Sequence, residues 1–227
     1  MTLTQASVSQ ASVAQASVSR REQRTVDSRE RILDAAVACL IEAGFSGATT
    51  LRIQDRAGVS RGRLLHHFPS RDVLLVAAAH HLAERRVRAT IEKAAAELSG
   101  LTAGPRRVER VVELMWETHH EPHYWAAVEL WTASRTDDEI AAALLAEERK
   151  LGGAIRSAVD GMFGPEVADL PPYAMLRDLL LAAMRGQALT YAFDRRDPAG
   201  DPHLEQWKDL ARQLVSEPEQ VTAEQGS

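Results

Sequence analysis

Residues 57–71 read Ala-Gly-Val-Ser-Arg-Gly-Arg-Leu-Leu-His-His-Phe-Pro-Ser-Arg, and this stretch predicts the local fold of the N-terminal third of the chain. Gly58 can adopt the left-handed backbone that ends one helix, and Ser60 can cap the next by accepting a hydrogen bond from a free backbone amide. Pro69 cannot continue that second helix, and Ser70 can cap another one. The stretch therefore indicates a short helix that starts at Ser60 and ends just before Pro69.

A longer helix is predicted upstream of this stretch. Asp27 followed by Glu30 resembles a capping box, in which two side chains satisfy free amides of a first helical turn. Apolar residues then recur at helical spacing, and Gly44 can end the helix. The pattern predicts a helix over about 28–43.

The same reasoning places helices over the rest of the chain. A short helix, with Thr49 or Thr50 as its cap, should run to about Arg56. With the helix that follows Gly58, it forms a candidate helix-turn-helix. Because no alternating strand pattern or hairpin signature occurs, we expect an all-α fold. The further predicted helices are 70–98, 105–119, 122–134, 137–162, 171–195 and 202–215.

Charge is distributed unevenly along the chain, which carries a net charge of −5. Residues 20–90 contain 13 Arg and 8 Asp plus Glu, a local balance of +5, whereas residues 91–227 have a balance of −10. A basic segment can neutralise phosphates even in an anionic protein, because salt screens the remote acidic charges within about 8 Å. The net negative charge of the whole chain therefore does not exclude a nucleic-acid partner.

Composition also predicts how the chain is divided. Residues 1–24 contain Gln-Ala-Ser-Val three times and should be a disordered tail. A helix-turn-helix domain is expected over 25–70, a second helical domain over 71–216, and a second disordered tail over 217–227.

The cysteine count and the length of the apolar runs indicate where in the cell the protein is expected. The chain has one cysteine, Cys39, which lies in an apolar helical stripe and is expected to be a core residue. A single cysteine allows no disulfide framework, which favours a cytoplasmic location. The longest apolar runs fall far short of the roughly 20 residues that span a bilayer, so no membrane partner is expected.

The motifs resemble those of a known family. Gly44-Phe45, Thr49-Thr50, Ile53, the run from Ala57 to Arg71, and Leu74 together resemble the DNA-binding domain of the tetracycline-repressor (TetR) family over about residues 28–75. The resemblance implies a homodimeric regulator whose second short helix enters the major groove of a near-palindromic operator. It also implies that the helical domain over 71–216 dimerises and binds a small-molecule effector, which releases a repressor from its operator. We expect no cofactor, no metal, no catalytic residue and no enzymatic activity.

The predicted DNA contacts follow from residue chemistry. Arg61 and Arg63 can bond guanine edges or adjacent phosphates, and Gly62 leaves room for the backbone to approach the groove. Leu65 occupies a position where relatives commonly have a tyrosine, so a phenolic bond to phosphate is absent. The predicted DNA-binding residues are Thr49, Thr50, Arg52, Ser60, Arg61, Gly62, Arg63, Leu65, His66, His67 and Arg71.

Effector residues are harder to identify, because aromatic side chains line ligand cavities and ordinary cores alike. The predicted set is Trp116, His120, Tyr124, Trp125, Glu129, Met162, Met184 and Tyr191. Two alternatives remain open: a metal-assisted hydrolase that uses the His119/His120 cluster, and a DNA-binding dimer without any ligand. Pro122 argues against a shared metal, since it places His123 on a different helix from His119.

A dimer interface is predicted from the helix over 171–195, which is apolar almost all round between Ala174 and Met184 and must therefore bury both faces there. One face would pack within the subunit and the other against the same helix of a second subunit, which gives a four-helix interface. The predicted interface residues are Leu176, Leu180, Ala183, Gly186, Gln187, Leu204, Trp207, Ala211 and Leu214.

Overall fold

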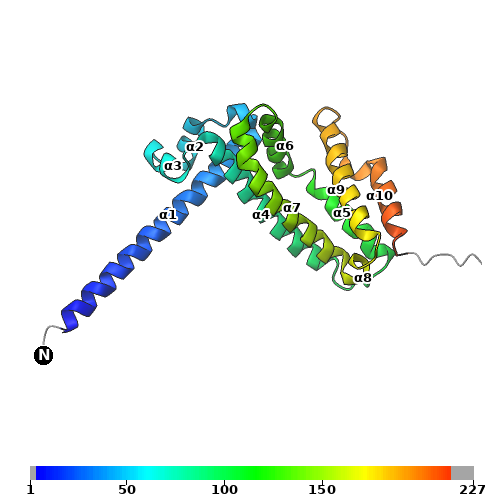
Figure 1. The fold of residues 1–227 in the computed structure, drawn as a ribbon, viewed down its shortest axis with the longest axis horizontal. Coiled ribbons are helices and arrows are strands. Elements are labelled where there is room, and N and C mark those ends of the chain that lie inside the picture. The colour runs from blue at the N-terminus through cyan, green and yellow to red at the C-terminus, as the bar shows by residue number, and fades with distance from the viewer. Residues whose placement is uncertain (1–3, 216–227) are drawn as a thin grey trace, which may run out of the picture. The chain divides into compact units, whose positions relative to one another are not determined.

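The computed structural model describes residues 4–215, with side chains from residue 25 onward. This part of the chain is built from helices and contains no strand, which confirms the all-α class. The helices (Figure 1) are α1 (Thr4–Gly47), α2 (Thr50–Ala57), α3 (Arg61–His67), α4 (Arg71–Glu97), α5 (Pro105–Thr118), α6 (Pro122–Ser134), α7 (Asp138–Phe163), α8 (Pro165–Ala168), α9 (Tyr173–Leu189) and α10 (Pro202–Arg212). Two 3₁₀ turns, Thr190–Ala192 and Pro198–Gly200, lie between α9 and α10.

Most helix boundaries agree with the predictions, and three differ. Helix α9 ends at Leu189, where a 3₁₀ turn replaces its expected last turn. Helix α8 was not predicted, because Gly164-Pro165 was interpreted as a break between two helices. A proline also fits the first turn of a helix, and Pro165 occupies that position in α8. Helix α1 begins at Thr4 rather than near residue 28.

The early start of α1 differs from the expected disordered tail over 1–24. No Gly or Pro occurs between Thr4 and Asp27, so no residue there breaks a helix that has formed downstream. The predicted end of this helix is confirmed, because Gly44 has a left-handed φ of 65° and kinks the chain. The predicted tail over 217–227 lies outside the described residues.

The chain forms two compact units, and three helices contribute to both. Unit 1 extends to residue 82 and includes 126–147, whereas unit 2 comprises 83–125 and the chain from 148 onward. The helices shared by the two units are α4, α6 and α7. The helix-turn-helix segment is therefore part of a larger unit than the predicted 25–70.

Unit 1 has one apolar core that holds the helix-turn-helix. Helix α1 supplies much of it, and Cys39 is fully buried there as predicted, which raises the pKa of its thiol. Burial of each large apolar side chain stabilises the unit by about 1.5–3 kcal/mol. The largest of these side chains are Ile32, Leu33, Leu40, Ile53, Leu64, Phe68, Leu74, Leu75, Leu130, Ile140 and Leu144.

Unit 2 is held together by apolar packing and by ion pairs along α5. Helix α10 packs against α5, and Trp207 meets Trp116 with ring centroids 5.0 Å apart. Arg110 of α5 pairs with Glu97 of α4 at 2.5 Å, and Lys208 of α10 pairs with Glu113 of α5 at 2.8 Å. Several coupled charges of this kind hold helices together better than isolated surface pairs do.

Candidate nucleic-acid interface

Two capped helices and a glycine turn build the helix-turn-helix. The Thr49 hydroxyl accepts a hydrogen bond from the amide of Arg52 at 3.3 Å, and the Ser60 hydroxyl accepts one from the amide of Arg63 at 3.3 Å. Between the two helices Gly58 has a φ of 63°, a conformation that side chains disfavour. The local sequence thus fixes where α2 ends and where α3 begins.

Helix α3 has one buried face and one exposed face. Leu64 and Phe68 are almost completely buried in the unit 1 core and anchor the helix there. The remaining positions are open to solvent except for His67, which is half-buried. The exposed α3 face consists of Arg61, Gly62, Arg63, Leu65 and His66.

The arginines of unit 1 fall into two groups. Among the described residues, neither Arg61 nor Arg63 makes a hydrogen bond or an ion pair through its guanidinium group. Arg52 and Arg56 of α2 instead share the carboxylate of Glu42, at 3.7 and 2.7 Å. These pairs are about half exposed, so a phosphate could compete with Glu42 for Arg52. Arg61 and Arg63 could bind a phosphate or a base without first breaking an ion pair.

Arg71 has internal partners and does not fit its predicted role as a DNA contact. Its Nε donates to the carbonyl of Ala48 at 3.0 Å, and its Nη2 donates to the carbonyl of Phe45. The guanidinium carbon also lies 4.3 Å from the centre of the Phe45 ring. Arg71 therefore ties the start of α4 to the end of α1, where four carbonyls lack helical partners.

His67, another predicted DNA contact, is held against α1. Its Nε2 lies 2.8 Å from the hydroxyl of Ser28. Burial lowers the pKa of His67, and the neighbouring side chains of His66, Arg63 and Arg29 lower it further. A neutral, hydrogen-bonded His67 positions α3, whereas His66 on the exposed α3 face is the histidine available to a ligand.

Glu129 was predicted to bind an effector, but it has a structural role in unit 1. Its carboxylate accepts a hydrogen bond from the amide of Phe45 at 2.8 Å, immediately after the kink at Gly44. Ser70 makes a comparable link by donating to Glu139 of α7 at 3.1 Å. Contacts between residues 69 and 84 positions apart leave no local signal in the sequence.

Three of the predicted effector residues, Trp116, His120 and Tyr191, form a packed aromatic core. Trp116 is buried and donates through Nε1 to the carbonyl of Pro198 at 2.9 Å. His120 lies edge-on to Trp116 and to Tyr191, with ring centroids 4.3 and 4.7 Å apart. These side chains therefore pack as an ordinary core rather than as the lining of an open cavity.

A buried carboxylate organises the polar edge of this aromatic core. Asp201 accepts hydrogen bonds from the hydroxyl of Tyr191 at 2.7 Å, the amide of Gln187 at 3.0 Å and the backbone of His203 at 2.9 Å. Burial favours the neutral acid, but these bonds outweigh it and hold the pKa of Asp201 well below its usual range. Gln187, which was predicted at the dimer interface, is thus engaged within the subunit.

Tyr124, Trp125 and Met184 also pack within unit 2. The Tyr124 hydroxyl donates to the carbonyl of Arg185 at 2.6 Å, and burial raises its pKa to about 12. Met184 is fully buried, and Trp125 lies edge-on to Tyr124. None of these three side chains lines the cavity described next.

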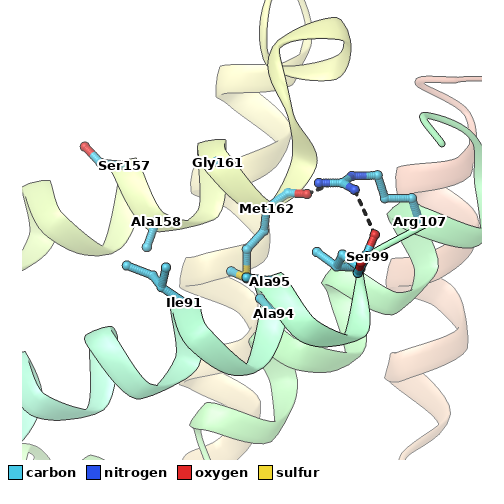
Figure 2. Close-up of a pocket in the computed structure, with 10 residues that line it drawn as sticks. Ile91, Ala94, Ala95, Ser99, Arg107, Ser157, Ala158, Gly161 and Met162 are labelled. Carbon is cyan, nitrogen blue, oxygen red and sulfur yellow. Dashed lines mark hydrogen bonds between the residues drawn. The ribbon is translucent and has the colours of Figure 1, made fainter. Parts of the chain in front are cut away.

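A cavity of about 300 Å³ lies between α4 and α7 in unit 2. Figure 2 shows the Met162 side chain pointing from α7 toward Ala94 and Ala95 of α4. Met162 is the one predicted effector residue among its walls, which are Ile91, Ala94, Ala95, Leu98, Ser99, Arg107, Ser157, Ala158, Gly161 and Met162. The sequence carries no aromatic or polar signal for this cavity, because small side chains form most of it.

Arg107 closes one end of this cavity and ties the ends of two helices together (Figure 2). Its Nε donates to the carbonyl of Met162 at 3.0 Å, and its Nη1 donates to the carbonyls of Leu98 and Leu101 at 3.4 and 3.1 Å. A cation is favourable at a helix C-terminus, where the last carbonyls lack partners. The polar end of the cavity is therefore positively charged.

The histidines that suggested a metal site face different partners. Nδ1 of His119 lies 3.0 Å from the carbonyl of Met115, and burial lowers its pKa to about 4. Nδ1 of His123 instead lies 3.6 Å from the Glu121 carboxylate. Over residues 25–215, no three His, Cys, Asp or Glu side chains are placed to hold one metal ion.

The predicted dimer interface needs correction. Five of its members are buried within their own subunit: Leu176, Leu180, Leu204, Trp207 and Ala211. Leu214 is half-buried, whereas Ala183 and Gly186 are exposed. The exposed side of α9 also carries Met175 and Leu179, which are 66% and 55% exposed. Phe193, just beyond the helix, is 82% exposed.

This exposed side of α9 is one continuous helical stripe. Met175, Leu179, Ala183 and Gly186 recur every three or four residues, and an apolar stripe of this kind indicates a protein contact. The periodicity did not reveal which face packs inside, because both faces of α9 are apolar.

No helix in the described part of the chain is long and apolar enough to cross a bilayer.

The fold and the exposed α3 face define the class of helix-turn-helix proteins. Residues 32–78 match the model of the bacterial regulatory proteins of the tetR family. The transcriptional repressor AcnR of Corynebacterium efficiens is 31% identical over 113 residues, which cover 48% of this chain and 58% of that protein. AcnR of Corynebacterium diphtheriae is 31% identical over 129 residues, or 56% of this chain and 60% of that protein.

The chain thus spans about three fifths of the length of these two relatives. Among solved structures, the multidrug binding protein EbrR in complex with imidazole is similar, with a TM-score of 0.58 and 21% identity. That likeness covers 84% of this chain and 96% of EbrR, and it supports the all-α fold.

Proposed function

We propose that the chain is a homodimeric transcriptional repressor that binds a near-palindromic operator through α3 and is released by a small molecule. The observation that carries this proposal is the exposed α3 face, with two unpaired guanidinium groups on a helix whose opposite side is anchored in a core. A rigid helix of this kind fits the major groove. The AcnR relatives are themselves named transcriptional repressors.

Arg61 and Arg63 supply the base contacts in this proposal. Arginine can bond the O6 and N7 atoms of guanine with two hydrogen bonds, which discriminates against other bases by about 1–3 kcal/mol. Gly62 lies between them, and a Cβ at that position would meet open space, so the backbone is free to approach the groove. Thr49, Thr50 and Arg52 at the start of α2 would contact phosphates and set the register.

A binding measurement tests the DNA-binding proposal. Operators are selected from a random duplex pool, and affinities for selected and random duplexes are measured over a range of salt concentrations. Arg63→Ala should weaken specific binding by roughly 1–3 kcal/mol and leave random duplexes much less affected. The control is Arg156→Ala in unit 2, which removes the same charge from an exposed position of α7. Equal losses in both variants, or no binding to duplex DNA at low salt, would refute the proposal.

The exposed side of α9 is the proposed dimer surface. Met175, Leu179 and Phe193 offer large apolar side chains, and Gly186 permits close approach of a second helix. A symmetric pair of α9 and α10 helices would form a four-helix interface. Two copies of α3 could then meet half-sites one DNA turn apart, about 34–36 Å.

The cavity between α4 and α7 is the proposed effector site. Both helices that line it continue into unit 1, so a ligand that shifts them would alter the unit that carries α3. A coupling of about 1–3 kcal/mol between effector and operator is typical of such switches. Operator affinity that no tightly bound compound changes would instead support a dimer that acts without a ligand.

A further inference from the structure

Leu65 on the exposed α3 face has no evident role in the fold. Its side chain is 43% exposed, whereas Leu64 beside it is 1% exposed in the core. Arg61 lies one turn before Leu65 and His66 follows it, so the leucine is an apolar group within a polar and basic surface. A single exposed leucine is unremarkable on most surfaces, but this one lies on the helix proposed to enter the groove.

The chemistry of the major groove restricts what Leu65 can contact. Every base edge there presents hydrogen-bond donors or acceptors, and the 5-methyl group of thymine is the one apolar group. Leucine has no donor for a phosphate, and packing it on a polar edge would remove water without replacing its hydrogen bonds. Thymine is therefore the base that a leucine can favour.

We infer that Leu65 is a specificity-determining residue that selects thymine by packing on its 5-methyl group. This inference rests on the proposed DNA-binding function and extends it, because the guanidinium groups alone would select guanine. Arg61 and Leu65 share a face one helical turn apart, about 5.4 Å along the helix axis. Base pairs stack about 3.4 Å apart, so the thymine should lie within about two base pairs of the guanine that Arg61 reads.

Deoxyuridine provides the test, because it lacks the 5-methyl group of thymine and keeps its hydrogen-bonding edge. Operators are first selected from a random pool with the full chain, and each thymine is then replaced in turn. One thymine position in each half-site should weaken binding about fourfold when replaced, which corresponds to about 0.8 kcal/mol for one buried carbon group. Replacement in both half-sites should weaken binding about fifteenfold.

Leu65→Ala identifies the residue that senses the methyl group. This variant should bind the unmodified operator more weakly and should no longer distinguish thymine from deoxyuridine at that position. The matched control is Leu51→Ala, which truncates another exposed leucine of unit 1, on α2. The control variant should keep the full sensitivity to deoxyuridine.

The outcomes separate this inference from the function on which it rests. If the chain binds no duplex DNA, the proposed function fails and the inference fails with it. If the chain binds a selected operator but tolerates deoxyuridine at every position, only the inference is overturned. The same holds if Leu65→Ala loses as much affinity to deoxyuridine as the unaltered chain does.

Discussion

Replacing Arg71 distinguishes a structural arginine from a DNA-binding one. The sequence motif places Arg71 beside the helix-turn-helix, where a phosphate contact is expected, but the structure gives its guanidinium the carbonyls of Ala48 and Phe45 and the Phe45 ring. Arg71→Ala should therefore lower the stability of the chain rather than its intrinsic affinity for DNA.

The size of the effect follows from these contacts. A hydrogen bond from a charged donor contributes about 1.5–3 kcal/mol, and a cation above an aromatic ring adds about 0.5–1 kcal/mol at exposed sites. Because a quarter of the Arg71 side chain is exposed, the low end of each range applies, and the two carbonyl bonds with the ring contact give a loss of about 3.5 kcal/mol. For a chain of this length such a loss lowers the melting temperature by about 7–14 °C.

Urea unfolding measures the loss, and DNA binding is measured separately at a temperature where the variant is fully folded. Arg71→Lys keeps the charge but not the planar group, so it should recover part of the stability at most. Arg63→Ala is the control for stability, because its exposed, unpaired side chain should change stability by less than about 0.5 kcal/mol. A fully stable Arg71→Ala protein with weaker affinity for all duplexes would refute the structural assignment and restore the phosphate contact.

Three further predictions concern unit 2. Leu179→Glu places a charge on the exposed side of α9 and should weaken dimerisation at least tenfold in sedimentation experiments, whereas an unchanged dimer would exclude this surface. Ala158→Phe should fill the cavity between α4 and α7 and abolish the response to an effector while operator binding persists; a preserved response would place the effector elsewhere. His119 is neutral when folded because burial lowers its pKa to about 4, so unfolding takes up a proton as the pH falls below about 6.5. Stability should accordingly decrease between pH 6.5 and 4, by at most about 3 kcal/mol, and this slope should be smaller in urea unfolding of His119→Gln; an unchanged slope would contradict the assignment.

Local signals in the sequence were sufficient to locate most helices. Thr49, Ser60 and Ser70 cap the helices that they were predicted to cap, because a capping bond joins residues three positions apart. Gly44 and Gly58 end helices for an equally local reason, which is the left-handed backbone that glycine tolerates. The exposed residues of α3 follow from the same local geometry, and their contacts with DNA stay a prediction.

The incorrect predictions concern side chains whose surroundings are set by residues far away in the sequence. Glu129 was predicted to face an effector because aromatic residues surround it in the sequence, yet its partner is the amide of Phe45, 84 positions away. Trp116 could equally line a pocket or a core, and only the packing of α10 on α5 decides between them. The two sides of α9 are similarly apolar, so the sequence could not distinguish buried Leu180 from exposed Leu179.

The kink at Gly44 restricts how this chain can vary. A Cβ at position 44 would lie 3.1 Å from a carboxylate oxygen of Glu129, and the backbone there has a φ of 65°. Shortening Glu129 would relieve the crowding but not the backbone strain, and it would also leave the Phe45 amide without its acceptor. Positions 44 and 129 should therefore change together or not at all, and a saturation library at both sites should recover few functional pairs besides glycine with glutamate.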